Sequence, residues 1–202
     1  MAGNMKIGVL ALQGDVSEHI HALESAMKDS NIHGNVVPVR RVSELGQISA
    51  LLMPGGESTT IAKQVQRFDL REPIIEFGKS GNPIMGTCAG CILLATKILD
   101  QKGPEDVTPL GLMDISVRRN AFGRQAESFE KSLKIEGLDS EFPGVFIRAP
   151  SIMRIGKNVT SMAKLGKEHV MVKQGSILGL TFHPELVADT RVHKLFLDML
   201  KI

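Results

Sequence analysis

Tryptophan and tyrosine are absent from the 202-residue chain, which has eight phenylalanines. Aromatic platforms for stacking nucleic-acid bases are therefore scarce. An excess of one charge is also lacking, because 24 lysines and arginines nearly balance 22 aspartates and glutamates. A near-neutral chain is only weakly attracted to phosphate backbones or anionic membranes. We therefore expect no nucleic-acid partner, and we interpret Arg118 and Arg119 as a solvated face or a contact for a small anion.

Long hydrophobic runs are missing as well. Apolar runs such as Ile92–Ala95 are far shorter than the roughly 18 residues of a membrane-spanning helix. The first six residues lack the basic and then apolar pattern of a signal peptide. We therefore expect no membrane association and a cytoplasmic location. Hydrophobic residues make up 43% of the chain, which is ordinary for a folded protein, and the length favours one domain over residues 1–202.

Cysteine is scarce, since only Cys88 and Cys91 occur. A disulfide framework would need more cysteines that are spread further apart. A structural zinc site would need four ligands, and the six histidines do not form ligand-spaced pairs beside these cysteines, so we predict no metal site. A catalytic thiol, a redox pair and inert packing remain as possible roles.

Short apolar runs alternate with helical patterns along the first half of the chain. Strands are predicted over 6–12, 36–39, 50–53 and 83–85 there, and over 115–117, 145–147, 159–165, 169–172 and 177–181 later. Pro38 indicates an edge or irregular position for the second strand. A final helix carries its apolar stripe on Val192, Leu195, Phe196, Met199 and Leu200. This alternation predicts an α/β fold, a three-layer, doubly wound and mostly parallel sheet with helices on both faces and extra antiparallel strands in the second half.

The segment Gly86-Thr87-Cys88-Ala89-Gly90 lies between a predicted strand and a helix predicted over 91–99. It has the pattern of a nucleophile elbow with cysteine in place of serine. The thiol would project at the start of the helix, where unpaired N–H groups favour the thiolate, and the Ala89 N–H would face an oxyanion. A glycine-rich turn with a packed cysteine is the alternative. The spacing of Cys88 and Cys91 also permits a redox pair, although we interpret Cys91 as a core residue.

The tripeptide His183-Pro184-Glu185 follows the last predicted strand. A neutral imidazole can accept the thiol proton, and a carboxylate on its other ring nitrogen fixes the tautomer. Residues two apart in an extended chain face the same side, which places Glu185 beside His183. A loop histidine without a catalytic role is the alternative. The other histidines, His19 and His21 among them, are interpreted as surface or structural residues.

A second glycine turn, Pro54-Gly55-Gly56-Glu57-Ser58, ends another predicted strand. Such loops line the ligand crevice of open parallel sheets. The Gly56 N–H would complete an oxyanion hole with Ala89, and Glu57 would attract a substrate ammonium. The alternative is an ordinary turn with a helix cap at Ser58 or Thr59. The inner face of that next helix would be Ile61, Ala62, Val65 and Phe68.

Taken in this order, these segments resemble those of the class I glutamine amidotransferases. Segments along nearly the whole chain are similar to the glutaminase subunits of pyridoxal 5′-phosphate synthase in particular: residues 8–14, 54–59, 86–90, 120–125 (Asn-Ala-Phe-Gly-Arg-Gln), 146–150 (Phe-Ile-Arg-Ala-Pro) and 183–185. The resemblance implies hydrolysis of L-glutamine to L-glutamate and ammonia without a cofactor. It also implies a synthase partner that receives the ammonia, with a dodecameric core and up to twelve glutaminase subunits.

The resemblance further implies the role of individual residues. Cys88 would attack the amide, His183 would transfer protons and Glu185 would orient His183. Gly56 and Ala89 would form the oxyanion hole, and Gln13 would lie in a loop that the synthase settles on docking. The glutamine-binding residues would be Gly56, Glu57, Ser58, Arg119, Ile147 and Arg148. Arginine suits the substrate carboxylate because its planar fork can bond both oxygens.

Three other functions compete with this interpretation. A cysteine peptidase or stress-response protein on the same fold would share the elbow, but it would not need the segments 54–59 and 146–150 in this form. A redox protein would depend on Cys91. A subunit that only regulates a synthase would not need Cys88, His183 and Glu185 together.

Overall fold

The computed structural model describes residues 5–101, 103, 107–119 and 128–200. The first half of the chain and its last strand build a parallel region from β1 (Met5–Leu10), β2 (Gly34–Val39), β3 (Ala50–Met53), β4 (Ile84–Thr87) and β12 (Ile177–Leu180). The second half adds β5 (Ala95–Ile98), β6 (Met113–Arg118), β9 (Ser151–Ile155), β10 (Thr160–Leu165) and β11 (Glu168–Gln174). The helices are α1 (Val16–Asp29), α2 (Val42–Leu45), α3 (Ser58–Arg67), α4 (Arg71–Lys79), α5 (Ala89–Leu94) and α6 (Arg191–Leu197), with a 3₁₀ turn, η1, over Pro184–Leu186.

These strands form a ten-stranded sheet in the order β2-β1-β3-β4-β12-β11-β9-β6-β5, with β10 paired to β11. From β2 to β12 every neighbouring pair is parallel, whereas β11 pairs antiparallel with β12, β9 and β10. A small antiparallel sheet of β7 (Ser128–Leu133) and β8 (Phe142–Ile147) lies apart from it. The predicted fold class is confirmed, and so is the edge position of Pro38, because β2 is the outermost strand.

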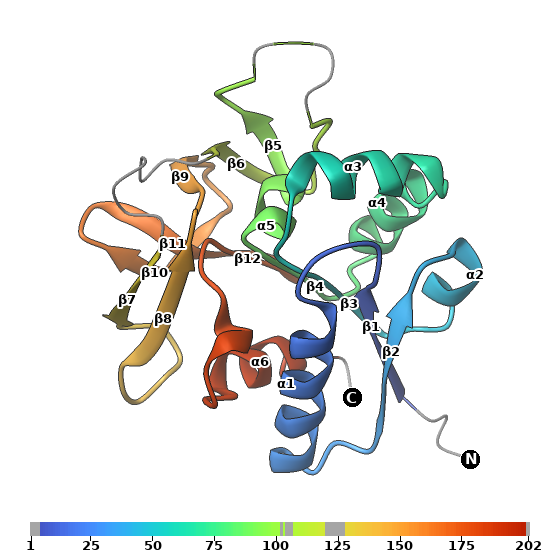
Figure 1. The fold of residues 1–202 in the computed structure, drawn as a ribbon. Coiled ribbons are helices and arrows are strands. Elements are labelled where there is room, and N and C mark those ends of the chain that lie inside the picture. Colours follow the sequence, from blue (N-terminus) through green and yellow to red (C-terminus); the bar gives the residue numbers. More distant parts are fainter. Residues whose placement is uncertain (1–4, 102, 104–106, 120–127, 201–202) are drawn as a thin grey trace.

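Helices cover both faces of the sheet, so the fold has three layers (Figure 1). Leu51 and Met53 point into a core shared with α3, α4 and α5. Leu52, between them, points into a second core shared with α1, α6 and the β7–β8 sheet. Alternation along a strand explains this division, because successive side chains leave opposite faces. Strands buried on both faces read as continuous apolar runs, as the sequence does here.

Two expectations about helices are wrong. The helix predicted over 91–99 ends at Leu94, because Ala95 takes an extended conformation and residues 95–98 pair with β6 as a strand. Phe68 was expected on the inner face of its helix, but it follows the last helical residue and is 46% exposed. Its ring lies under the Arg67 guanidinium at 5.9 Å instead of in the core.

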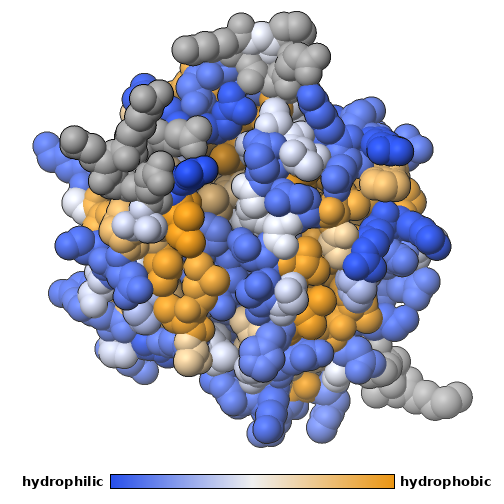
Figure 2. Space-filling view, viewed as in Figure 1, coloured by the Kyte–Doolittle hydropathy of each residue, from blue (hydrophilic) through white to orange (hydrophobic). Residues whose placement is uncertain are grey.

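No helix in the described part of the chain is long and apolar enough to cross a membrane. The face seen in Figure 1 is mostly hydrophilic, with its apolar residues gathered in separate bands (Figure 2).

The carboxyl ends of β1, β3, β4 and β12 lie side by side, as the parallel pairing requires. The loops that leave these ends contain most of the residues that the sequence analysis singled out.

Candidate active site

Cys88 lies in a sharp turn between β4 and α5. Its backbone has φ of +48°, a conformation that a non-glycine residue rarely adopts. The turn is packed closely against β3, since a Cβ on Gly90 would lie 2.1 Å from the Met53 carbonyl oxygen. The Cys88 N–H donates to the Leu180 carbonyl at 2.8 Å, which ties the turn to β12. The chain therefore holds Cys88 at a fixed place, in the strained geometry that a nucleophile elbow requires.

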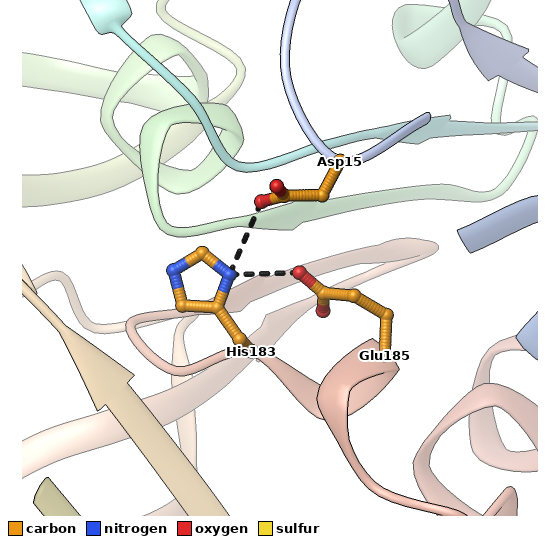
Figure 3. A group of neighbouring side chains, drawn as sticks. All are labelled: Asp15, His183 and Glu185. Carbon is orange, nitrogen blue, oxygen red and sulfur yellow. Dashed lines mark hydrogen bonds and ion pairs between the residues drawn. The ribbon is translucent and has the colours of Figure 1, made fainter. Parts of the chain in front are cut away.

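His183 follows β12 and faces the elbow. Its backbone N–H donates to the Val145 carbonyl of β8 at 2.8 Å. Its Nδ1 lies 2.7 Å from Glu185 Oε1 and 3.4 Å from Asp15 Oδ2, so both carboxylates point at one ring nitrogen (Figure 3). One Nδ1–H is best donated to the nearer Glu185, with Asp15 as a second negative charge.

The contact between His183 and Glu185 confirms that the two side chains lie together, although the predicted reason is wrong. Glu185 belongs to the 3₁₀ turn η1, not to an extended chain. The tight turn folds the carboxylate back toward the ring. Asp15, His183 and Glu185 also offer ligand atoms within 4.8 Å of one another. Since both carboxylates are directed at the same Nδ1, this geometry favours an oriented histidine over a metal centre.

The charges around His183 favour its protonated form. Burial opposes protonation, but the neighbouring Asp15, Cys88 and Glu185 groups outweigh it and raise the His183 pKa to about 12. The hydrogen bond to His183 holds the pKa of Asp15 below its usual value. Burial raises the pKa of Glu185, against the lowering effect of His183. An imidazolium therefore stands next to the Cys88 thiol, an arrangement suited to a thiolate–imidazolium pair.

A cavity of about 490 Å³ opens beside Cys88 and His183. Eight residues that the sequence analysis assigned to the site line it, and so do three that it did not assign. They are Gly56, Glu57, Ser58, Cys88, Arg119, Ile147, Arg148 and His183, together with Asp15, Ile92 and Leu186. The cavity thus joins a thiol, an imidazole, two arginines and residues of two glycine-containing turns, a set that offers a nucleophile, a base and cationic groups for a substrate.

A family model describing the SNO glutamine amidotransferase family matches residues 9–202. The chain belongs to this family. It is therefore a glutamine amidotransferase, an enzyme that uses the amide nitrogen of glutamine. The resemblance to glutamine amidotransferases that the sequence motifs suggested is confirmed.

Relatives of this amidotransferase extend over nearly its whole length. It is similar to the pyridoxal 5′-phosphate synthase subunit PdxT of Brevibacillus brevis, with 51% identity over 98% of each chain. The PdxT subunit of Methanothrix thermoacetophila is 48% identical over 96% of this chain and 98% of its own. A crystal structure titled glutamine amidotransferase superposes with a TM-score of 0.84 at 44% identity, covering 96% of this chain and 97% of the other. PurLQS from Thermotoga maritima, 18% identical with a TM-score of 0.68, shares the fold and covers 97% of each chain.

The predicted cap of the helix after the Gly55–Gly56 turn is wrong, because Glu57 has that structural role in the amidotransferase. Glu57, not Ser58 or Thr59, is the N-cap of α3. Its carboxylate accepts hydrogen bonds from the backbone N–H groups and the hydroxyls of Thr59 and Thr60. Burial raises the Glu57 pKa, but these donors outweigh it and lower the pKa to about 2. Glu57 thus lines the cavity as a fixed anion whose two oxygens already hold a helix end.

Gln13 reaches from the loop after β1 into the Gly55–Gly56 turn. Its side-chain oxygen accepts a hydrogen bond from the Glu57 N–H at 2.8 Å. Gly56 has φ of +144°, and a Cβ there would lie 2.6 Å from that same oxygen. The two loops therefore fix each other, and Gly56 is the residue that lets them approach. Ala89 is fully buried. Because it is the first residue of α5, its N–H has no partner within the helix.

The two predicted arginines enter the cavity from different strands. Arg119 follows β6 and is held by Asp100, which accepts from its backbone N–H at 3.1 Å and lies 3.8 Å from its Nε. Arg148 follows β8 with φ of +43°, and Ile147 before it brings its carbonyl oxygen to 4.0 Å from Cys88 Sγ. The Asn-Ala-Phe-Gly-Arg-Gln segment, residues 120–125, lies outside the described residues.

Sequence reasoning missed Asp15, which lies directly before α1 and to which it assigned no role. A carboxylate directly before an amphipathic helix is an ordinary helix start, so the residue type gave no signal of its own. Here the Asp15 side chain makes no cap hydrogen bond and points at His183 instead. The interpretation of Cys91 as a core residue is confirmed, since it is fully buried and burial raises its pKa to about 12.

Proposed function

We propose that residues 1–202 form a single glutaminase domain that hydrolyses L-glutamine to L-glutamate and ammonia through a Cys88–His183–Glu185 triad. The observation that carries this proposal is the wall of one cavity, on which Cys88 and His183 face each other while Glu185 binds His183 from behind at 2.7 Å. A buried thiol and imidazole held by two separate strands are the parts that covalent catalysis requires.

The reaction begins with attack of the Cys88 thiolate on the side-chain amide carbon of glutamine. The C=O π electrons move to oxygen, and the N–H groups of Gly56 and Ala89 stabilise the resulting oxyanion. The His183 imidazolium donates its proton to the amide nitrogen as the C–N bond breaks and ammonia leaves. His183, now neutral, removes a proton from water, which attacks the carbonyl carbon of the glutamyl thioester. The C–S bond then breaks, glutamate is released, and the Cys88 thiolate and the His183 imidazolium are restored. Glu185 keeps the Nδ1–H tautomer through both steps.

Substrate recognition uses the charged groups of the cavity wall. The guanidinium groups of Arg119 and Arg148 supply positive charge for the glutamine α-carboxylate. Glu57 supplies a nearby negative charge for the ammonium, acting through its field because threonine donors already engage its oxygens. Gly56, Ser58 and Ile147 complete the wall beside the amide.

The ammonia passes to the synthase subunit of pyridoxal 5′-phosphate synthase. The relatives at 46 to 51% identity are named as subunits of this complex. In this proposal up to twelve glutaminase subunits surround a dodecameric synthase core in the cytoplasm. Gln13 transmits docking to the site, since it joins the loop after β1 to the backbone of the Gly55–Gly56 turn. The proposed reaction needs no cofactor and no metal.

Ammonia release from L-glutamine, measured with and without the cognate synthase subunit, tests this function. We expect release that increases when the synthase is present and disappears in Cys88→Ala. Cys91→Ala serves as the matched control, because it removes a neighbouring thiol that lies in the core. Absence of Cys88-dependent release from the assembled complex contradicts the proposal.

A further inference from the structure

Two histidines lie fully buried behind the proposed triad. His19 belongs to α1 and His193 to α6, helices that contact each other on the same face of the sheet (Figure 1). The surrounding core is otherwise mostly apolar. Burying two imidazoles there costs free energy unless their nitrogens form hydrogen bonds. Their contacts therefore indicate what they are for.

His19 contacts both the elbow and the triad carboxylate. Its Nε2 lies 3.0 Å from the Thr87 hydroxyl oxygen, in the residue directly before Cys88, and 3.3 Å from Glu185 Oε2. While Oε1 of Glu185 binds His183, Oε2 is buried and has no hydrogen bond of ordinary geometry with the described residues. A buried carboxylate charge needs donors around it. The long contact with His19 Nε2 is the interaction in place to supply one.

The second nitrogen of His19 determines which nitrogen carries the proton. His19 Nδ1 lies 3.2 Å from His193 Nε2, so one of the two must donate and the other accept. If Nδ1 of His19 were the donor, Nε2 would direct its lone pair at the carboxylate oxygen. The opposite assignment gives His193 Nε2–H to His19 Nδ1, and it shares His19 Nε2–H between the Thr87 hydroxyl, its partner of ordinary geometry, and the more distant Glu185 Oε2. His193 Nδ1, which has no hydrogen-bond partner among the described residues, then carries a lone pair and not a buried N–H that lacks an acceptor.

Both histidines are electrically neutral in this arrangement. Burial, the nearby His193 and His183 lower the pKa of His19 well below its usual value. Burial lowers the pKa of His193 to about 4. Each neutral ring thus carries one N–H, which suits a series of hydrogen bonds in which each imidazole donates once. Glu185 then receives hydrogen bonds from two sides, from His183 on Oε1 and from His19 on Oε2.

We infer that His19 is a positioning residue for the reaction, holding Glu185 and the elbow in register by donating Nε2–H to Glu185, while His193 fixes the tautomer of His19. The inference rests on the proposed glutaminase function. Without the donor, the buried Oε2 of Glu185 loses its contact with His19 Nε2, and the carboxylate is free to turn away from His183. The thiol–imidazole pair then loses its orientation, although the substrate cavity keeps its lining.

Three variants in the assembled complex test the inference. His19→Leu removes the donor, and we expect kcat to fall about ten- to a hundredfold, the usual effect of losing a hydrogen bond to a charged group. KM should remain within about twofold, because His19 does not line the cavity and uniform binding is unchanged. His19→Gln places an amide N–H near the position of Nε2 and should recover most of kcat. His21→Leu, on the exposed side of the same helix, is the matched control and should match the unaltered enzyme.

Histidine ¹⁵N chemical shifts give a readout that does not depend on activity or on whether a variant folds. In the unaltered protein we expect the Nε2–H tautomer on both His19 and His193, and a neutral ring at neutral pH. An Nδ1–H tautomer on His19 overturns the inference, and so does a folded His19→Leu enzyme with the kcat of His21→Leu. If the unaltered complex releases no Cys88-dependent ammonia, the proposed function itself fails. Failure of the inference about His19 alone leaves ammonia release by the unaltered complex intact.

Discussion

Replacing Asp15 with asparagine removes one of the two negative charges directed at His183 and keeps the shape of the side chain. Asp15 Oδ2 lies 3.4 Å from His183 Nδ1. At that distance Coulomb's law gives about 5 kcal/mol with an effective dielectric constant of 20, and about 1 kcal/mol in bulk water. Because the Asp15 side chain is 36% exposed, screening brings the effect toward the lower value. We expect Asp15→Asn to lower the His183 pKa by roughly one unit, which is about 1.4 kcal/mol.

The assay is an NMR titration of the His183 ring in Cys88→Ala protein, with and without Asp15→Asn. Removing the thiol takes away its contribution to the raised pKa and brings the midpoint to lower pH. Asp69→Asn, in the exposed turn after α3, is the charge-matched control and should leave the midpoint in place. Equal midpoints with and without Asp15, or a higher one in Asp15→Asn, refute the electrostatic reasoning.

The same substitution has a predictable effect on the free energy of unfolding. The raised pKa of His183 stabilises the fold fully below the ordinary value of 6.5, and this contribution is lost as pH rises through the folded-state pKa. The lowered pKa of Asp15 stabilises the fold above 3.8, and this contribution is lost as pH falls through its folded-state pKa. Urea unfolding should therefore show the largest loss in Asp15→Asn between pH 3.8 and 6.5, and a shrinking loss above that range.

Three further predictions concern the neighbouring loops and thiols. Gly56→Ala forces a strained φ and a Cβ 2.6 Å from Gln13, so thermal melting should show a loss of about 1 to 3 kcal/mol together with reduced ammonia release. Glu57→Ala removes the cap of α3 and should cost about 1 kcal/mol at neutral pH; because the Glu57 pKa is lowered from 4.5 to about 2, the difference from the unaltered protein should vanish as pH falls through that range in acid unfolding. Iodoacetamide should label Cys88 and spare Cys91 in the folded protein, as peptide mass spectrometry would show, because burial raises the Cys91 pKa to about 12; equal labelling of both contradicts the assignment.

The sequence predicts the fold well where burial is two-sided. The strands β3, β4 and β12 are buried along their whole length and consist mostly of apolar residues, so their existence follows from hydrophobicity. Residues 95–98 are different, because Ala95 and Ile98 continue the apolar pattern of the preceding helix and only pairing with β6 makes them a strand. Local pattern cannot reveal such a tertiary contact.

Site residues divide in a similar way. Cys88, His183 and Glu57 stand in motifs with glycine or proline, whose backbone meaning is readable from sequence. Asp15 and His19 carry no such mark, since the first resembles a helix cap and the second is one histidine on an amphipathic helix. They meet Glu185 and His183 only because α1 packs beside η1, far along the chain. Residue types indicated the chemistry, whereas the supporting contacts depend on long-range packing.

The position of β12 between β4 and β11 decides when this chemistry becomes available. Cys88 leaves the ribosome in the first half of the chain, but the strand that brings His183 to it is nearly the last to be made. Until β12 is inserted, β4 is an unfinished sheet edge and the thiol has no imidazole beside it. Incomplete chains therefore cannot hydrolyse glutamine by the proposed route, and local unfolding that detaches β12 removes both the His183 imidazole and the Leu180 carbonyl that holds the Cys88 N–H.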